Sequence, residues 1–405
     1  MRSSKISFTN KQGEELSGRL DLPADQDPHN FAIFAHCFTC TKDFSAVRNI
    51  SKALASEGFG VLRFDFTGLG DSDGDFADTN FSSNIEDLSC AAAYLEEHFK
   101  APSLIVGHSL GGAAAIFAAS EIDSIQAVAT IGAPSNPVHV QKQLGDKIAT
   151  IQQEGEAVVT LAGRDFTFKK QFIEDLETCS CTEAAGDLHK ALLILHSPQD
   201  ATVSIKNAEE IYHAAHHPKS FVTLDGSEHL LIDKKNAAYV GKVVAGWAAR
   251  YIDVPKEEVI KTTHDVVASL DDEDGFTTQM KLGKHYMKAD EPIRVGGNDY
   301  GPTPYEFLAG SLSACTAMTI QMYAKRKGWL IENVQVHTSY SRDYAQDCGA
   351  CGDDPSAKID TFIREIYLEA ELDEKQRERI LEIADKCPVH KTLHNETQVI
   401  TSYAT

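Results

Sequence analysis

Positive charge is scarce in this chain, and the shortage argues against two classes of partner. The 405 residues include 38 lysines and arginines against 60 aspartates and glutamates, so the formal net charge is −22 at pH 7. A surface this acidic repels phosphate backbones and anionic lipid headgroups. We therefore expect no nucleic acid and no membrane among the partners, and small molecules as substrates.

Apolar leader segments and cysteines are also in short supply. Residues 1–8 contain no apolar core, so we expect no secretory signal. One uncharged stretch, residues 101–120, is long enough to span a bilayer, but its glycines and polar residues indicate a strand, a turn and a helix. The nine cysteines are an odd number spread over a long chain, which does not suggest a disulfide framework. We expect a cytoplasmic protein of at least two domains.

Residues 1–252 alternate short apolar strands with amphipathic helices. Strands buried on both faces and separated by helices predict the α/β class, with a mostly parallel sheet. Residues 135–190 break the rhythm with helix-like segments and no clear sheet strand, and we interpret them as a helical lid. The strand candidates are residues 31–35, 60–64, 104–106, 127–131, 192–196 and 221–224.

A proline and a charged run within residues 253–264 end this rhythm and predict a linker. Residues 265–405 have a different order of elements, which predicts a separate α+β domain. The expected elements are a hairpin over 265–282, a helix from Pro304 to about Lys327, strands at 334–340 and 361–371, a helix at 374–386 and a strand at 398–403.

A serine motif marks the first half. Residues 107–111 read Gly-His-Ser-Leu-Gly, with an apolar strand before them and a small-residue helix after them. Such a sharp strand-to-helix turn needs glycines, because neighbouring backbone leaves no room for a Cβ. The turn raises the serine oxygen above the sheet and aims the helix N-terminus at a developing oxyanion. We therefore predict Ser109 to be a nucleophile.

A nucleophilic serine needs a base, and the base needs an orienting acid. In this type of fold the acid follows the serine, and the histidine comes last. Two later strands run into loops, one ending at Asp200 and the other at His229. We predict His229 as general base and acid and Asp200 as its orienting acid. Asp225 and Glu228 are alternative acids, less suited because they share the histidine's own loop.

An oxyanion hole needs two backbone N–H donors. We predict the first at Leu110, directly after the nucleophile, and the second in the loop after strand 31–35. That loop reads His-Cys-Phe-Thr-Cys, so the second donor is the N–H of Phe38 or of Cys37. The same loop contains a Cys-x-x-Cys pair, Cys37 and Cys40.

Residues 30–250 resemble the α/β-hydrolase superfamily. With the loops at 36–40 and 196–200, they are similar to the hydrolase half of a bacterial family fused to an OsmC-like domain. The resemblance implies a serine hydrolase that cleaves small esters or thioesters through an acyl-serine intermediate. We expect it to need no cofactor and no metal ion.

Two cysteines stand out in the second half. Cys315 lies among small residues in the long helix, and Cys387 lies where a later helix meets a proline. A lone helical cysteine is usually core packing. Two cysteines that are remote in sequence can instead meet as an attacking thiolate and its resolving partner.

The segment 301–308, Cys315 and the Cys-Pro-Val-His run at Cys387 resemble the OsmC/Ohr family of thiol-dependent peroxidases. The resemblance implies organic hydroperoxide substrates, a thiol reductant and a homodimer through this domain, with Cys315 peroxidatic and Cys387 resolving. It also implies a glutamate and an arginine beside the thiolate. Glu306 matches the glutamate, and Arg294 is the arginine that precedes the motif. Glu306 is half a turn from Cys315 on a straight helix, so their pairing needs a helix break or a second chain.

A further Cys-x-x-Cys pair, Cys348 and Cys351, lies in an acidic loop. No second pair follows at a zinc-site spacing, so a metal role is disfavoured and a redox accessory role stays open. We interpret Cys179 and Cys181 as inert lid residues.

Three functions remain open for the whole chain. Both halves can be catalytic, as an esterase and a hydroperoxide reductase. Alternatively, only the esterase half is catalytic and the other half is a dimerisation module, or both halves form a ligand or redox sensor. The full set of Ser109, Asp200 and His229 argues against the sensor, which has no need of all three.

Overall fold

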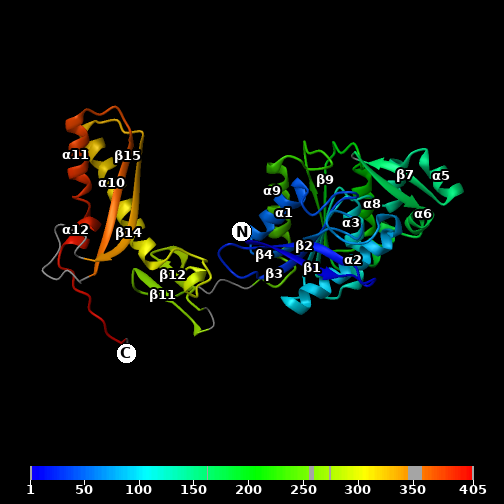
Figure 1. Cartoon of the computed structure of the whole chain (residues 1–405), viewed down its shortest axis with the longest axis horizontal. Helices are drawn as coiled ribbons and strands as arrows, with labels where there is room; N and C mark the ends of the chain where they lie inside the picture. The colour runs from blue at the N-terminus through cyan, green and yellow to red at the C-terminus, as the bar shows by residue number, and fades with distance from the viewer. Residues whose placement is uncertain (1, 162, 255–259, 273–274, 345–357, 404–405) are drawn as a thin grey trace. The chain divides into compact units, whose positions relative to one another are not determined.

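The computed structural model describes residues 2–161, 163–254, 260–272, 275–344 and 358–403 (Figure 1). The chain divides into two compact units, Met1–Glu258 (unit 1) and Val259–Thr405 (unit 2). No helix in these described ranges is both long enough and apolar enough to cross a membrane.

Unit 1 is built on a sheet whose described strands run in the order β1-β2-β4-β3-β5-β6-β9-β10. The β1–β2 and β2–β4 pairs are antiparallel and all other neighbours are parallel, which confirms the predicted mostly parallel sheet. Strands β3 to β6 and β9 are buried throughout, which explains their continuous apolar sequences. The bounds are β1 Arg2–Thr9, β2 Glu15–Leu22, β3 Asn30–Ala35, β4 Phe59–Phe64, β5 Leu104–His108, β6 Ala127–Ile131, β9 Ala191–His196 and β10 Lys219–Thr223.

Helices cover both faces of this sheet (Figure 1). Alternate residues of each central strand point to opposite faces and join two separate apolar cores. On one face lie α1 (Ser45–Ser56) and α9 (Lys234–Ala248). On the other lie α2 (Phe81–His98), α3 (Leu110–Glu121) and α8 (Lys206–Ala214), with the short turn η1 (Phe76–Asp78) before α2.

The insertion between β6 and β9 is only partly the helical lid that we predicted. It contains a β-hairpin, β7–β8, that pairs apart from the main sheet. The period-two pattern around Phe166 and Phe168, which are buried between more exposed residues, explains the second strand. The elements are η2 Pro137–Val140, α4 Gln141–Leu144, α5 Lys147–Glu154, β7 Glu156–Leu161, β8 Arg164–Lys169, α6 Lys170–Glu177 and α7 Cys181–Asp187.

Unit 2 has the predicted α+β composition, with an additional short helix, α12, and two differences among the strands. The expected hairpin has a third strand, β13, and residues 398–403 form no strand, because no strand in the described part of this chain pairs with them. Helix α10 packs on β14, α11 and α12. The elements are β11 Val266–Ser269, β12 Thr278–Leu282, β13 His285–Ala289, η4 Ile293–Val295, α10 Pro304–Lys327, β14 Asn333–Tyr344, β15 Lys358–Glu369, α11 Glu374–Ala384 and α12 Pro388–His394.

Candidate active sites

Ser109 sits at a tight turn between β5 and α3. Its φ of 55° lies in the left-handed region, which is costly for a residue with a side chain and is typical of a nucleophile elbow. A Cβ on Gly107 would lie 2.3 Å from the Gly111 carbonyl oxygen, and one on Gly111 would lie 2.3 Å from that of His36. The two glycines of the motif are therefore required by close backbone contact.

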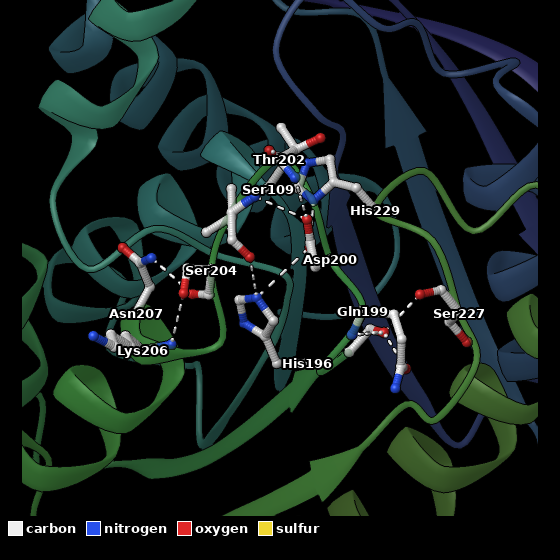
Figure 2. Close-up of polar contacts among 12 residues, drawn as sticks. Ser109, His196, Gln199, Asp200, Thr202, Ser204, Lys206, Asn207, Ser227 and His229 are labelled. Atoms are coloured by element: carbon white, nitrogen blue, oxygen red, sulfur yellow. Dashed lines mark hydrogen bonds and ion pairs between the residues drawn. The ribbon is translucent and has the colours of Figure 1, made fainter.

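Ser109, His229 and Asp200 form a continuous chain of hydrogen bonds. His229 Nε2 lies 2.9 Å from Ser109 Oγ, and His229 Nδ1 lies 2.6 Å from Asp200 Oδ2. Figure 2 shows the three side chains pointing toward one another from three separate loops, after β5, β9 and β10. Asp200, and neither Asp225 nor Glu228, is thus the acid that contacts the histidine.

The loops that carry the acid and the histidine are joined to each other. Ser197 Oγ donates to the Ser227 carbonyl at 2.6 Å, and the Gly226 N–H donates to Gln199 Oε1 at 2.8 Å. Burial opposes ionisation of Asp200, but the His229 bond and the Val203 and Thr202 N–H groups outweigh it and hold the pKa of Asp200 below its usual value. The carboxylate is therefore ionised at neutral pH and can stabilise a protonated His229.

Two buried histidines support this chain, and sequence reasoning missed both. His108 Nε2 lies 2.7 Å from the His229 carbonyl oxygen, and His196 Nε2 lies 2.8 Å from that of Val203 in the acid's loop. Burial lowers the pKa of His108 to about 4 and also lowers that of His196. Both rings are therefore neutral at pH 7. Each donates a hydrogen bond from Nε2 to a carbonyl oxygen, and each of these bonds fixes one of the two loops.

The Cys37–Phe38 peptide is held from its carbonyl side. His36 Nδ1 and the Cys40 N–H donate to the Cys37 carbonyl, at 2.9 Å and 3.0 Å. Because a trans peptide directs its N–H opposite to its C=O, the Phe38 N–H points away from these donors. Neither this N–H nor that of Leu110 donates to any acceptor within the described residues. Both are available to a developing oxyanion.

A disulfide joins Cys37 to Cys40 and closes this same loop. Sequence reasoning noted the Cys-x-x-Cys spacing but predicted no disulfide. Thr39, inside the closed turn, has a φ of 61°, again in the left-handed region. The disulfide therefore constrains the segment that carries the Phe38 donor.

A buried ion network anchors the far end of the loop. Lys42 Nζ lies 2.5 Å from Asp65 Oδ2, and the Lys42 N–H donates to Asp65 Oδ1 at 2.6 Å. Arg63 donates to the Lys42 carbonyl at 2.6 Å and pairs with buried Asp21 at 2.7 Å. This network fixes the segment after β4 relative to the oxyanion loop.

A cavity of about 430 Å³ opens over the serine. This volume is within the usual range for small-molecule sites. Ser109, His229 and Phe38 line it together with the disulfide and with Arg164 from the lid hairpin. The lid phenylalanines 166, 168 and 172 do not line it; they pack with Phe38 and Phe76 instead.

In unit 2, Cys315 and Cys387 lie next to each other. Cys387 is completely buried at the N-terminus of α12, where its Sγ accepts the His390 N–H at 3.3 Å and lies 3.7 Å from the Thr316 hydroxyl. Burial opposes ionisation, but the hydrogen bonds from His390, Cys315 and Thr316 outweigh it and lower the pKa of Cys387. Cys315, on α10, is only half-buried.

The described part of this single chain brings neither predicted thiolate partner into hydrogen-bonding contact with Cys315. Glu306 forms a capping box with Thr303 at the start of α10, which runs unbroken past the cysteine. Arg294 is exposed and forms no hydrogen bond or ion pair with the described residues. The arginine that reaches this region is Arg364 on β15, which sequence reasoning missed. It donates to Thr316 Oγ1 at 2.8 Å.

Among the described residues, the remaining cysteines are free thiols. Cys348 and Cys351 lie outside the described residues. Cys179 and Cys181 are free thiols whose pKa values are raised by burial, as befits inert residues. Within the described ranges, no group of three or more histidine, cysteine, aspartate or glutamate side chains is placed to hold a metal ion.

Comparisons with known proteins agree with this division. A model of the "Alpha/beta hydrolase family" matches residues 32–276, and a model of "OsmC-like protein" matches residues 296–402. The crystal structure of the esterase domain of a Rhodothermus marinus protein is 47% identical, with a TM-score of 0.52, covering 62% of this chain and 99% of that one.

More distant structures share the fold alone. Est1E from Butyrivibrio proteoclasticus, solved with ferulic acid, is 22% identical with a TM-score of 0.54, covering 61% of this chain and 98% of that one. The alpha/beta hydrolase GrgF from Penicillium sp. sh18 is 18% identical with a TM-score of 0.51, covering 62% and 99%. No curated protein matches the chain.

Proposed function

The chain belongs to the alpha/beta hydrolase family and carries a C-terminal OsmC-like domain, and from this premise we propose that it is a serine esterase fused to a thiol-dependent hydroperoxide reductase. The observation that carries the esterase is the hydrogen-bonded series from Ser109 through His229 to Asp200, beside two unoccupied N–H donors. Its substrates are small esters or thioesters that fit the cavity over Ser109.

The proposed ester reaction has two halves. His229 Nε2 takes the proton of Ser109 as Oγ attacks the carbonyl carbon of the ester. The resulting oxyanion accepts hydrogen bonds from the N–H groups of Phe38 and Leu110. The imidazolium, stabilised by Asp200, then gives its proton to the leaving alcohol or thiol. A water molecule, deprotonated by the same histidine, hydrolyses the acyl-serine and restores the free enzyme.

Unit 2 supports a different chemistry. The Cys315 thiolate attacks the O–O bond of a hydroperoxide ROOH and becomes a sulfenic acid. The alkoxide RO⁻ that leaves takes up one proton and is released as ROH. Cys387 then attacks the Cys315 sulfur, so that a disulfide forms and water leaves. An external dithiol reduces the disulfide and returns both thiols.

The roles of the two thiols are assigned from their solvent exposure and from the pKa of Cys387. Attack on a hydroperoxide requires an open sulfur, which half-buried Cys315 offers and buried Cys387 does not. The resolving step requires a thiolate close to the oxidised sulfur. A lowered pKa and direct contact with Cys315 suit Cys387 to that step.

We also propose a homodimer through unit 2. Cys315, Met318 and Met322 lie at i, i+3 and i+7 on α10, and therefore on one helix face. Met318 and Met322 are 65% and 72% exposed. A second copy of the chain would cover this apolar face, and it would also provide a route for Glu306 or Arg294 to reach the thiol of its partner.

One experiment with two substrates and two variants tests both activities. 4-Nitrophenyl butyrate hydrolysis and dithiol-driven reduction of cumene hydroperoxide are measured for wild type, Ser109→Ala and Cys315→Ser. We expect each variant to lose only its own activity, with the ester rate falling ~10⁴-fold or more in Ser109→Ala. Ester hydrolysis that survives Ser109→Ala removes the triad assignment. Absence of peroxide turnover in the wild type leaves unit 2 as a dimerisation module.

A further inference from the structure

Arg164 is the one lysine or arginine among the described residues that line the cavity over Ser109, and no aspartate or glutamate lines it. It lies at the start of β8, on the hairpin that sequence reasoning did not foresee. Arg164 is an exposed residue that lines this cavity, and a permanent positive charge in that position favours a substrate of negative charge. The esterase therefore has a specificity feature that the triad alone does not provide.

Within the described ranges of the chain, the guanidinium of Arg164 has no carboxylate partner. It donates one hydrogen bond to the Thr39 carbonyl and lies over the Phe166 ring, 5.3 Å from its centroid. A guanidinium carries five N–H donors, so most of them have no acceptor within the described residues. By contrast, Arg63 and Arg364 each pair with an aspartate at 2.7–2.8 Å. Exposed Arg294 also has no ion pair with the described residues, but Arg164 differs from it in lining the cavity over Ser109.

Both contacts of Arg164 fix its position without neutralising its charge. The Thr39 carbonyl belongs to the disulfide-closed oxyanion loop, and Phe166 is a buried residue of the lid hairpin. The guanidinium is thus held at the cavity wall with its remaining donors free. Arginine in this state is well suited to bidentate binding of a carboxylate.

We propose that Arg164 binds a carboxylate on the substrate, so that the preferred substrates are esters or thioesters that carry a free carboxylate. This inference rests on the proposed esterase function and adds the substrate class. The carboxylate can belong to the acyl part, as in a dicarboxylic acid monoester, or to the leaving group. The two cases share the same contact with Arg164.

Three esters test the proposal on the full-length protein. The mono-4-nitrophenyl ester of glutaric acid has an acyl-side carboxylate, 4-butyryloxybenzoate has a leaving-group carboxylate, and 4-nitrophenyl pentanoate is the neutral reference. For one of the two charged esters, we expect the kcat/KM of Arg164→Gln to be about 10- to 100-fold lower than that of wild type. This is the usual loss when a hydrogen bond to a charged group is removed. The loss on the pentanoate ester should be at least ten-fold smaller.

Two controls separate substrate binding from a structural role. Lys147→Gln removes the same charge from α5, away from the cavity lining, and should leave all three rates unchanged. Raising the salt concentration should slow the charged ester in wild type and not in Arg164→Gln. The charged ester that shows the loss identifies the side of the carboxylate.

The outcomes distinguish this inference from the function on which it rests. Equal losses on charged and neutral esters in Arg164→Gln would show that the residue only positions the Thr39 carbonyl, and would overturn the inference while the esterase stands. Hydrolysis of none of the esters by wild type would overturn the esterase itself.

Discussion

Unit 1 and unit 2 differ in how completely a single chain builds them. Unit 1 buries its sheet between two helical layers and completes its hydrogen-bonded triad from its own loops. Unit 2 has a small core around Ile320 and Ile380, and many of its large apolar side chains are exposed, although it is the shorter unit. The residues expected to hold its thiolate are not in contact with it.

The difference suggests that each unit reaches its working state in a different way. The exposed apolar residues of unit 1 are scattered singly, which is normal for a monomeric domain. Those of α10 share a face with Cys315, so whatever covers them also changes the surroundings of the thiol. We infer that unit 1 is a complete enzyme by itself, whereas unit 2 provides half of a site.

The largest predicted effect comes from breaking the proposed dimer contact over the exposed face of α10. Met318→Glu combined with Met322→Glu places two like charges on the exposed face of α10, and we expect the dimer dissociation constant to rise by ~10³-fold or more, because a buried unpaired charge is costly. Sedimentation velocity would show a monomer, peroxide turnover would be lost, and ester hydrolysis would be retained.

Tyr239→Glu is the matched control for this prediction. Tyr239 is 52% exposed on α9 of unit 1, so the variant also introduces a charge at an exposed apolar position. It should leave both the dimer and the peroxide activity intact. A wild-type protein that sediments as a monomer at every concentration would contradict the dimer proposal.

Local patterns in the sequence predicted those parts of unit 1 that depend on neighbouring residues of one strand and the loop after it. Strands such as β5 and β9 are continuous apolar runs that lead to Ser109 and Asp200, whereas His229 follows the more polar and only partly buried β10. The supporting histidines could not be predicted in this way, because their partners are chosen by the fold. His108 contacts a carbonyl 121 residues away, and nothing near position 108 indicates that pairing.

Unit 2 shows the same limit more strongly. The sequence located α10 correctly, including its start at Pro304, because a capping box and a proline are local signals. Arg364 was missed because it approaches Thr316 across 48 residues, from the neighbouring strand. The hairpin β7–β8 was missed because it lies between helix-like segments and its clear alternation is confined to the residues around Phe166 and Phe168.

A second prediction tests whether unit 1 is as fully preorganised as its contacts suggest. His108→Leu removes the donor to the His229 carbonyl while leaving every triad residue in place. We expect kcat for 4-nitrophenyl butyrate to fall about 10- to 100-fold with little change in KM, because a small displacement of a catalytic group has a large effect on rate. Steady-state kinetics measures this, and circular dichroism checks that the variant is folded. An unchanged kcat would show that the loop holds His229 without His108.

A third prediction concerns the stability that unit 1 loses by burying the carboxyl group of Asp87. Asp87 is buried, and burial raises its pKa to about 6, although the Thr67 N–H and hydroxyl donate to it. Because the folded pKa is above the unfolded value, the contribution of Asp87 to stability is greatest at low pH and is lost as the pH rises from about 4 through 6. Asp87→Asn removes this loss and can still bond both Thr67 groups.

We expect Asp87→Asn to gain about 1–3 kcal/mol at pH 8 and almost nothing at about pH 3, where this carboxyl is largely protonated in both the folded and the unfolded state. The gain corresponds to a rise in the melting temperature of unit 1 of several degrees. Differential scanning calorimetry at the two pH values measures it. An equal gain at both pH values would mean that the charge of Asp87 is not the cause.

The smallest predicted effect connects the two units through one reagent. The dithiol that regenerates unit 2 can also reduce the Cys37–Cys40 disulfide, which closes the turn behind the Phe38 N–H. Reduction frees this turn, and Thr39 no longer needs to remain at its unfavourable φ. We expect the ester kcat to fall about 3- to 10-fold in dithiothreitol, less than the loss of a whole oxyanion donor.

Cys37→Ser combined with Cys40→Ser should have the lower rate with or without dithiothreitol. If that double variant is as fast as oxidised wild type, the position of the Phe38 donor is set by His36 and the Lys42–Asp65 pair, and unit 1 is independent of thiol chemistry.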